Sequence, residues 1–322
     1  MAQNTQALQN DDTIRGLRQP RYWLDNSRFV GFLFLLPALL YIVLLVGIPF
    51  VVAILFSVSD VTVGDTTLDY IGLRNFEQVV GVRSFQNALV QSFMFTLVSQ
   101  FFIIILANML AIILTQEFRG KWFVRFLVIL PWATPVALGT IGWLWFFDSA
   151  FSPIDYVLRE LGLLGGPDAL LGRGRNMVWL GKPDLSRFSV MLVQVWRMTP
   201  LAAIILMAGL TAIPQDITDQ AKVDGSRFFR TLFEVKLPLI LPIMLVSLLF
   251  STVLTFGDMT VVYILTRGGP VDYTQVLPTW AYFVGIEGGN LGQGAAIALF
   301  IFPLLLAAAV VILRVVSRTE VN

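Results

Sequence analysis

Long apolar stretches separated by short polar segments dominate the chain. A helix that crosses a bilayer needs about 20 consecutive, mainly apolar residues. Six stretches are predicted to be spans of this kind: Phe29–Ser57, Ala88–Thr115, Phe123–Phe147, Phe188–Ala212, Leu237–Tyr263 and Ala295–Val316. A further apolar stretch, Val276–Ile286, is too short to span and is expected to lie in the interface or to dip in from one side. The pattern predicts an all-α polytopic membrane protein.

The composition fits this pattern and narrows the possible chemistry. Hydrophobic residues make up 57% of the 322 residues and charged residues only 13%, against about 25% charged in a soluble domain. The net charge of +1 offers no basic field for nucleic acid. The chain has no cysteine and no histidine, which excludes disulfides, thiol nucleophiles, Cys/His zinc sites and histidine acid–base chemistry. We therefore predict no catalytic residue and no metal site.

Positive charge is distributed unevenly about the predicted spans. The first span is preceded by a group of arginines: Arg15, Arg18, Arg21 and Arg28. With a cytoplasmic N-terminus, the inner segments hold more Lys and Arg than the outer segments, although the outer segments are longer in total. The first span is too long for a signal-peptide core and lacks a small-x-small cleavage site, so it is predicted to remain uncleaved. Both termini are predicted to be cytoplasmic, with 1–28 as a cytoplasmic segment and 29–322 as the transmembrane domain.

One charged segment interrupts the apolar pattern between the fourth and fifth spans. It reads TDQAKVDGSRFFRTLFEVKLPLILP over 218–242 and would face the cytoplasm. Pro214 and Asp216 suit a helix start, because proline is tolerated in the first turn and a carboxylate can cap free N–H groups. The range 217–224 can form two turns, and Gly225 is predicted to end them, since glycine adopts a left-handed conformation most easily.

A second short helix is expected after this turn. Ser226 can cap it, it would run through Phe233, and Pro238 would begin the next span. The result is a helix–turn–helix hairpin at 214–238, with a membrane span attached to each end. A force on the hairpin would be transmitted directly to these spans. Periodicity alone leaves a plain alternative open, a solvated connector that keeps positive charge inside.

The spacing of residues in the hairpin favours a coupling role. The positions concerned are Asp219, Gln220, Ala221, Asp224, Gly225, Val235, Leu237 and Pro238. Their order resembles the EAA loop of binding-protein-dependent ABC importer permeases: Glu-Ala-Ala, three residues, Gly, nine residues, Ile-x-Leu-Pro. In that family the loop is the coupling helix, which docks in a groove of the ATPase subunit. The chain departs from the pattern at Asp219, which stands for Glu, and at Gln220, which stands for the first Ala.

A second stretch narrows the resemblance to the carbohydrate-uptake branch, and in particular to the larger maltose permease (MalF-type). The matching positions are Phe256, Asp258, Leu265-Thr266, Gly268-Gly269-Pro270, Thr274, Tyr282, Asn290-Leu291-Gly292 and Ala295-Ala296. The resemblance implies a type I ABC importer (MetI-like) permease fold, with a sugar such as a di- or oligosaccharide as the solute. A non-sugar or sugar-phosphate solute such as glycerol 3-phosphate is the alternative.

The same resemblance implies partners and a location. The chain would work with a second homologous permease (MalG-type), an ATPase subunit dimer and an extracytoplasmic solute-binding protein. The assembly would lie in the lipid bilayer of a bacterial-type cytoplasmic membrane. No cofactor is expected on this chain, because ATP and magnesium would bind to the ATPase.

Other classes of function fit the sequence less well. ATP hydrolysis here would need a phosphate-binding loop G-x-x-x-x-G-K-[ST], but the nearest segment, at Gly181-Lys182, lacks the first glycine and is followed by Pro183. An intramembrane enzyme would need convergent titratable groups, and neither H-E-x-x-H nor paired intramembrane aspartates is evident. A secondary transporter or a channel is physically possible, but neither explains the spacing in the hairpin.

Arg197 is the sharpest anomaly within a span. It lies roughly 14 Å into the fourth span at 1.5 Å per residue, a depth at which a charge requires a partner or a water-filled cavity. Gln194 lies three residues earlier on the same helical face, and Asp258 is expected in the outer part of the fifth span. One interpretation pairs Arg197 with Asp258 as a contact between helices. The other has these groups, together with Trp196, lining the solute pathway.

Other polar and proline residues in the spans predict local features. Gln91, Gln100 and Asn108 do not share one helical face, so some of them must make contacts between helices. Prolines within the spans, including Pro131 and Pro135, are expected to introduce kinks.

Overall fold

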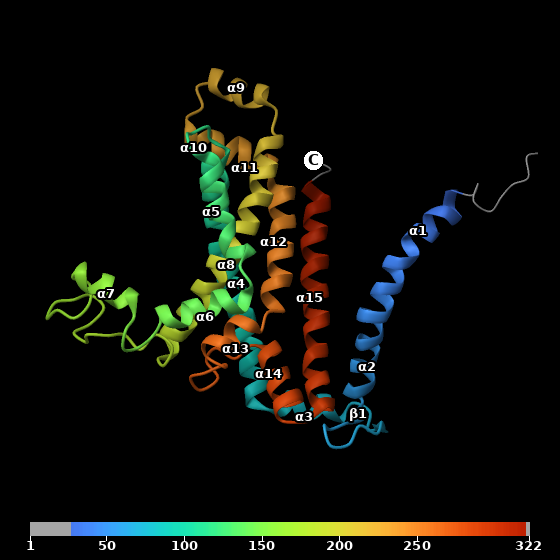
Figure 1. The fold of residues 1–322 in the computed structure, drawn as a ribbon. Coiled ribbons are helices and arrows are strands. Elements are labelled where there is room, and N and C mark those ends of the chain that lie inside the picture. Colours follow the sequence, from blue (N-terminus) through green and yellow to red (C-terminus); the bar gives the residue numbers. More distant parts are fainter. Residues whose placement is uncertain (1–26, 320–322) are drawn as a thin grey trace, which may run out of the picture. The chain divides into compact units, whose positions relative to one another are not determined.

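A computed structural model describes residues 27–319, and these residues are mainly helical (Figure 1). The chain divides into two compact units, Met1–Ala53 and Ile54–Asn322, which are described separately. Within the described residues, four helices are long and apolar enough to cross a membrane, or up to six if each of two bent helix pairs is one span. The prediction of about six membrane-spanning segments is consistent with this count.

The first unit is built on one long apolar helix. It begins as α1 (Ser27–Ile42), passes through the π-helical segment Val43–Gly47, and continues as α2 (Ile48–Ser57) into the second unit. Its side chains are almost all apolar, as expected of a helix that crosses a membrane. The first predicted span is therefore helical throughout. The basic residues Arg15, Arg18 and Arg21 lie outside the described residues.

The second unit starts with a small polar connection. Strands β1 (Ser59–Asp60) and β2 (Asp69–Tyr70) pair in antiparallel register and are followed by the short helix α3 (Arg74–Gly81). The buried Asn75 side chain donates hydrogen bonds to the carbonyl oxygens of Ser57 and Ser59, at 3.0 and 2.9 Å. These bonds satisfy the carbonyl groups where the helix ends and the strand begins.

Three long helices form the frame of the second unit. They are α4 (Arg83–Thr115), α8 (Pro183–Ala212) and α15 (Leu291–Thr319). Each begins four or five residues before the predicted start of its span, because helix continues beyond the apolar window that hydropathy detects. In α8 this extension opens with a proline in the first turn and Asp184, both favourable at a helix start.

The third predicted span, Phe123–Phe147, is wrong as a single helix. The chain forms α5 (Lys121–Ala133) and α6 (Val136–Phe146), which meet at an angle of 95°. The bend falls at Thr134, which is extended with φ −70° and ψ 136°. The residue before a proline is driven out of the helical region, and Pro135 has no N–H to continue the ladder. The expected kink is therefore real but much sharper than a kink in a continuous span.

The fifth predicted span, Leu237–Tyr263, is also interrupted. Helix α12 (Leu241–Phe256) stops at Gly257, and a separate helix, α13 (Thr260–Leu265), follows. Asp258 lies in the break, where its Oδ1 accepts a hydrogen bond from the backbone N–H of Thr260 at 2.7 Å. A carboxylate that satisfies a free N–H in this way favours a new helix start over continuation.

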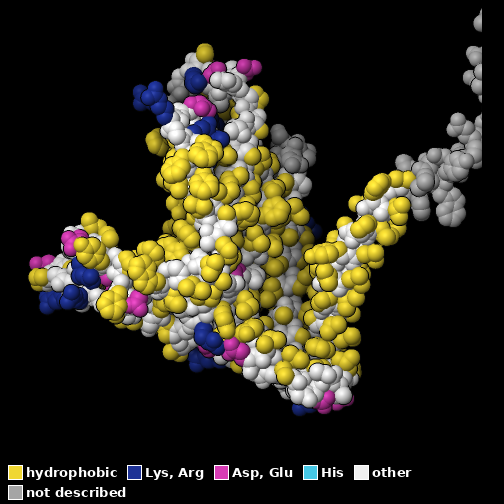
Figure 2. Space-filling view, viewed as in Figure 1, with side chains coloured by type: hydrophobic (Ala, Val, Ile, Leu, Met, Phe, Trp, Pro, Cys, Tyr) yellow, Lys and Arg dark blue, Asp and Glu magenta, His cyan; other side chains and the backbone are white. Residues whose placement is uncertain are grey.

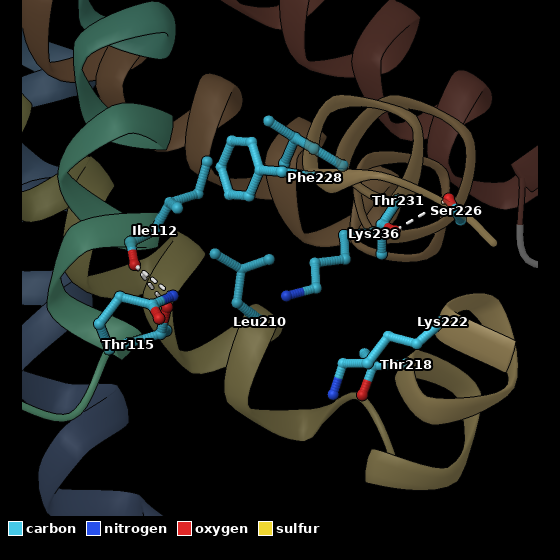
Figure 3. Close-up of a pocket in the computed structure, with 11 residues that line it drawn as sticks. Ile112, Thr115, Leu210, Thr218, Lys222, Ser226, Phe228, Thr231 and Lys236 are labelled. Atoms are coloured by element: carbon cyan, nitrogen blue, oxygen red, sulfur yellow. Dashed lines mark hydrogen bonds between the residues drawn. The ribbon is translucent and has the colours of Figure 1, made fainter.

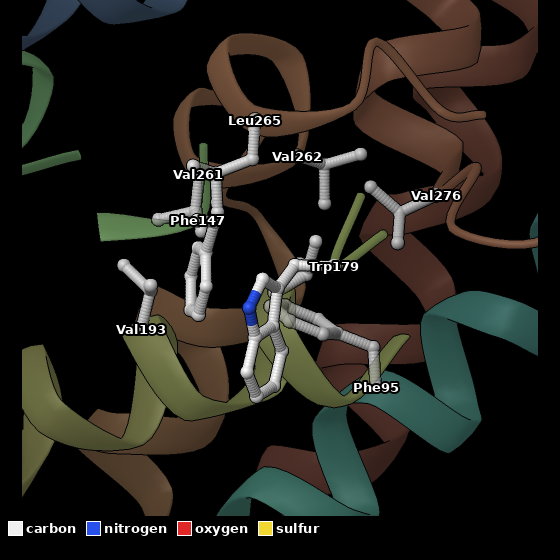
Figure 4. Packing of buried hydrophobic residues seen from close by; sticks show 9 residues of the cluster. Phe95, Phe147, Trp179, Val193, Val261, Val262, Leu265 and Val276 are labelled. Atoms are coloured by element: carbon white, nitrogen blue, oxygen red, sulfur yellow. The ribbon is translucent and has the colours of Figure 1, made fainter. Parts of the chain in front are cut away.

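The segment between α6 and α8 folds around a buried carboxylate. It contains α7 (Pro153–Glu160), whose Asp155 accepts hydrogen bonds from the Met177 backbone N–H and the Trp179 indole N–H, both at 2.9 Å. Trp179 in turn lies among Phe95, Phe147 and Val193 in a hydrophobic cluster shared with α4, α8 and α13 (Figure 4). This cluster attaches the connecting segment to the helices that carry the predicted pathway residues.

The short apolar stretch predicted at Val276–Ile286 is helical and packs within the second unit. It forms α14 (Leu277–Tyr282) and the π-helical segment Phe283–Glu287, which pack on α15 and α4. Contact with α15 is so close that a Cβ atom on Gly294 would lie 2.4 Å from the Cα of Gly285. Its depth relative to the membrane remains a prediction.

Candidate functional site

The hairpin between α8 and α12 opens with the predicted helix. Helix α9 (Gln215–Val223) begins directly after Pro214, with Asp216 in its first turn. Gly225 has a left-handed φ of +73°, and the Ser226 N–H donates to the Ala221 carbonyl at 2.9 Å. This is a glycine-terminated helix end, in which carbonyl groups of the last turn are satisfied by the chain that leaves it. The predicted helix and its glycine-terminated end are confirmed, but no side-chain hydrogen bond caps the start of α9, so the capping expected of Asp216 is not observed.

The second half of the hairpin differs from the prediction. Helix α10 (Phe228–Arg230), the π-helical segment Thr231–Lys236 and α11 (Leu237–Leu239) form one continuous piece (Figure 1). The side-chain oxygen of Ser226 caps no backbone N–H group. It accepts a hydrogen bond from the Thr231 hydroxyl instead, at 2.9 Å. The prediction that Ser226 caps the second helix is therefore wrong.

Pro238 does not begin the next span, because the helix runs past it to Leu239. The chain turns by 69° between this helix and α12, with Ile240 at the junction. The π-helical turn before Pro238 already interrupts the regular hydrogen-bond ladder, so a residue without an N–H is accommodated there. The hairpin therefore reaches α12 through a continuous helix and a single-residue corner.

The predicted coupling residues divide into a buried support and an exposed face. Ala221 is buried against the rest of the hairpin, and Leu237 and Val235 are half-buried. An open, shallow surface on the other side of α9 is lined by Asp216, Asp219, Gln220, Val223 and Asp224. The structure thus exposes a mixed acidic and apolar surface at the end of the hairpin. Figure 2 shows charged side chains gathered at this end of the second unit and hydrophobic ones along its helices.

The charged groups of the hairpin are paired along the surface of each helix. Asp219 and Lys222 form an ion pair at 2.7 Å, with side chains that are 55% and 69% exposed. On the second helix, the hydrogen bond from Arg230 to Glu234 at 2.8 Å raises the pKa of Arg230 above its usual value. Exposed pairs of this kind add little stability. They remain available to a partner surface.

A buried polar network joins three helices deep in the second unit. Gln194 of α8 and Gln100 of α4 both donate side-chain hydrogen bonds to the Thr255 hydroxyl of α12, at 2.9 and 3.2 Å. The Ser251 hydroxyl donates to the side-chain Oε1 of Gln100 at 2.6 Å. The prediction that some glutamines of the second span contact other helices is confirmed. Thr255 and Ser251 had not been predicted, although hydroxyl residues recur every fourth position in α12: Ser247, Ser251 and Thr255.

Arg197 is paired, as the first of the two interpretations requires. Its guanidinium donates to the carboxylate of Asp258 and to Oε1 of Gln194, the latter at 3.1 Å. The side chains of Arg197 and Asp258 are only 12% and 8% exposed. Two opposite charges in a region of low dielectric stabilise each other, and the carboxylate is further satisfied by the backbone of α13. The pair lies next to the Thr255 network through Gln194.

Trp196 is half-buried beside this site. Its ring packs edge-to-face on Trp143 of α6, with centroids 5.6 Å apart. A Cβ atom on Gly139 would lie 3.6 Å from the indole of Trp196, an ordinary van der Waals distance, so α6 and α8 lie close together here. The structure therefore brings all four predicted pathway residues into one region, where α6, α8 and the α12–α13 break meet. Within residues 27–319, no group of three or more acidic, histidine or cysteine side chains is placed to hold a metal ion.

Comparison with known proteins shows the family to which the chain belongs. The sequence profile described as "Binding-protein-dependent transport system inner membrane component" matches residues 103–321. The trehalose/maltose transport system permease protein MalF of Thermococcus litoralis is 29% identical over 286 residues, which cover 89% of this chain and 93% of that protein. The diacetylchitobiose uptake system permease protein DasB of Streptomyces coelicolor is 29% identical over 293 residues, covering 90% and 87%.

Among solved structures, the fold is similar to a chain of a bacterial alginate ABC transporter crystallised with an alginate pentasaccharide-bound periplasmic protein. The TM-score is 0.74 at 19% identity, with 91% of this chain and 96% of that chain covered. The helical, multi-pass architecture is thus the type I permease fold of ABC importers. The chain belongs to the family of binding-protein-dependent transport system inner membrane components.

Proposed function

We propose that this chain is the permease subunit of an ATP-driven importer for a sugar, most simply a di- or oligosaccharide. The observation that carries the proposal is the hairpin at 214–238, which exposes one face of α9 while its two ends continue into α8 and α12. Such a surface suits docking to a separate motor subunit. The sugar assignment is supported by the names of the relatives, which transport trehalose/maltose and diacetylchitobiose.

The assembly that we infer contains several chains. A second homologous permease (MalG-type) would pair with this one in a bacterial-type cytoplasmic membrane, and a dimer of ATPase subunits would bind the two coupling hairpins. A solute-binding protein would deliver sugar from the extracytoplasmic side. ATP and magnesium would bind to the ATPase alone. Both termini would be cytoplasmic, with 1–28 as a cytoplasmic segment and 29–322 as the permease domain.

The hairpin would act as the lever of the transporter. Closure of the ATPase dimer would displace the coupling residues at Asp219–Pro238, and α8 and α12 would have to follow, because only Ile213 and Pro214 separate α8 from α9 and only Ile240 separates α11 from α12. ATP can shift the inward–outward equilibrium only by as much as it prefers the closed dimer. Movement of these helices would change access to the buried polar region between them.

The solute pathway would pass the polar region at the α12–α13 break. Gln194 is buried behind the Arg197–Asp258 pair, with its amide held by Thr255 and Arg197, and it would position the arginine. Half-buried Trp196 supplies an aromatic ring on which a sugar ring can stack. Arg197 and Asp258 neutralise each other, so the region carries no unpaired charge in this arrangement. This balance favours a neutral sugar over an anion such as glycerol 3-phosphate, which would have to displace Asp258 from Arg197.

Gentle purification from the native membrane tests the proposal. The accompanying subunits would be identified by mass spectrometry, and the eluate would be assayed for ATP hydrolysis. We expect a second permease and an ATPase, with hydrolysis stimulated by a sugar-loaded binding protein. Recovery of the chain alone, with no ATPase captured by crosslinking at position 219, would contradict the coupling role.

A further inference from the structure

A pocket of about 360 Å³ lies on the side of the hairpin that faces the long helices (Figure 3). Its walls come from the last turns of α4 and α8 and from both helices of the hairpin. This side is distinct from the exposed acidic face of α9, which is lined by other residues. The volume lies at the lower end of the range of small-molecule sites.

The lining of the pocket is positively charged. Lys222 and Lys236 both contribute to it, and no aspartate or glutamate does. Lys222 is paired with Asp219 outside the pocket. Among the residues that the structure describes, the amino group of Lys236 has no hydrogen-bond or ion-pair partner, although this side chain is half-buried and extends into the pocket (Figure 3). An ammonium group held in such a place attracts an anion.

Neutral groups in the pocket add hydrogen-bond donors. The Ser226 hydroxyl accepts from Thr231, so its own hydrogen is free to be donated. The Gln116 amide makes one long hydrogen bond, at 3.4 Å to the Ile112 carbonyl, which leaves a second N–H available. Apolar side chains, including Leu210, form another part of the wall. Hydrogen-bond donors can bind the phosphate group of a phosphate ester, and the apolar side chains beside them can contact its organic substituent.

We propose that this pocket binds a phosphate ester, held by Lys236, Lys222 and Ser226. The phosphate could belong to a soluble cytoplasmic compound or to the headgroup of an anionic lipid, since the pocket lies where the spans leave the membrane in the proposed orientation. Binding is a property of this chain and does not depend on the proposed transport function, whereas the regulation that would follow from it rests on that function.

Occupancy of the pocket would regulate the hairpin. Its walls belong to two parts, the ends of α4 and α8 and the hairpin itself. A phosphate bridging them would favour the arrangement in which both parts surround it. A ligand that prefers one arrangement shifts the equilibrium toward it, so the anion would modulate how freely the lever moves.

The test uses the full chain with its accompanying subunits in nanodiscs, with excess ADP and magnesium to fill the nucleotide sites. Thermal unfolding of this chain is followed with inorganic phosphate in phosphatidylcholine, and separately in phosphatidylglycerol without free phosphate. Binding to the folded chain raises the unfolding midpoint. We expect the apparent affinity to fall about ten-fold or more in Lys236→Gln, as one charged hydrogen bond is lost. Lys236→Arg retains the charge and is expected to retain binding.

Arg230→Gln is the matched control, because Arg230 is a cation of the same hairpin that is paired with Glu234 outside the pocket. Stabilisation by free phosphate that is lost only in Lys236→Gln identifies a soluble ligand, and stabilisation only in phosphatidylglycerol identifies a lipid. No stabilisation in either arm, or equal loss in Arg230→Gln, overturns the proposal. If Lys236→Gln does not fold, Lys222→Gln gives the same comparison.

Discussion

Polar groups are buried and paired in the interior region around Arg197, whereas those of the hairpin are paired but exposed to solvent. In the interior, Arg197 and Asp258 are almost fully enclosed and satisfy each other, and Thr255 accepts hydrogen bonds from two helices. On the hairpin, Asp219 and Lys222 form a pair that is more than half exposed. Removing one partner of an interior polar contact is therefore expected to destabilise this chain, whereas the hairpin groups add little to its stability.

This difference separates two kinds of mutational effect. A change in the interior removes a partner from a group that water cannot reach, so it lowers the free energy of unfolding. A change on the hairpin leaves both groups in water, so the fold is retained and only an interaction with another chain is lost. Stability and transport should respond independently in the two regions.

The largest loss of stability is expected for Asp258→Ala. It leaves the Arg197 guanidinium buried without its carboxylate, a change that costs about 3–5 kcal/mol in other buried pairs. The unfolding of the purified chain in detergent measures it. The double variant Arg197→Met/Asp258→Leu should recover much of the stability, because neither charge remains. If that stable variant still transports sugar, the pair is structural and the pathway proposal for it is wrong.

Thr255→Val should lower stability by a smaller amount. The Gln194 and Gln100 amides would lose their common acceptor, and an unsatisfied buried polar group costs about 1–3 kcal/mol. Thr255→Ser keeps the hydroxyl and serves as the control. Equal stability of the Val and Ser variants would show that the network contributes nothing to the fold.

Gly225→Val tests the hairpin as a lever. A β-branched residue in a left-handed conformation costs about 1–2 kcal/mol, and no atom lies close enough to clash. The chain should stay in the membrane, with ATP hydrolysis no longer linked to transport. Gly120→Val is matched to it, since Gly120 has φ +83° and equally open surroundings outside the hairpin. Normal transport by Gly225→Val would exclude the lever.

The smallest change in stability is expected for Asp219→Asn. Loss of an exposed ion pair changes the free energy of unfolding by less than about 1 kcal/mol. Transport and the stimulation of ATP hydrolysis should nevertheless fall, because the carboxylate belongs to the proposed docking face. ATP hydrolysis by the reconstituted assembly is the measurement. If the Asp219→Asn variant were stimulated as fully as the unmodified protein, Asp219 would not belong to the coupling surface.

The sequence predicted the long helices because their signal is local. An apolar run of sufficient length is recognised from its own residues, as in α4 and α15. The sharp bends were not predictable in the same way. A proline such as Pro135 signals an interruption, but the 95° angle depends on how α6 packs on α13 and on the contact of its Trp143 with Trp196 of α8. Local helix propensity predicts where a helix is interrupted, and tertiary contacts determine the angle of the bend.

The candidate site was predictable where a charged residue lies within an otherwise apolar span. Arg197 stands out in an apolar span and needs a partner or a cavity, and Asp258 is an acidic residue of the neighbouring predicted span, so charge offered their pairing as one of two interpretations. Thr255 did not stand out, since threonine is unremarkable in a membrane helix and becomes important only through Gln100 and Gln194. The left-handed turn at Gly225 was predicted from local chemistry, while the π-helical turn that carries the helix past Pro238 has no recognised sequence signal.

The close contact between Gly285 and Gly294 has a consequence for genetic screens of this transporter. A single added methyl at Gly294 would overlap the backbone of the neighbouring helix and force the two segments apart. Variants there would score as loss of uptake although neither glycine belongs to the proposed pathway or to the docking face. Second-site suppressors of such variants would then map to the surrounding helix contacts, and they would report on the spacing of helices, not on solute preference.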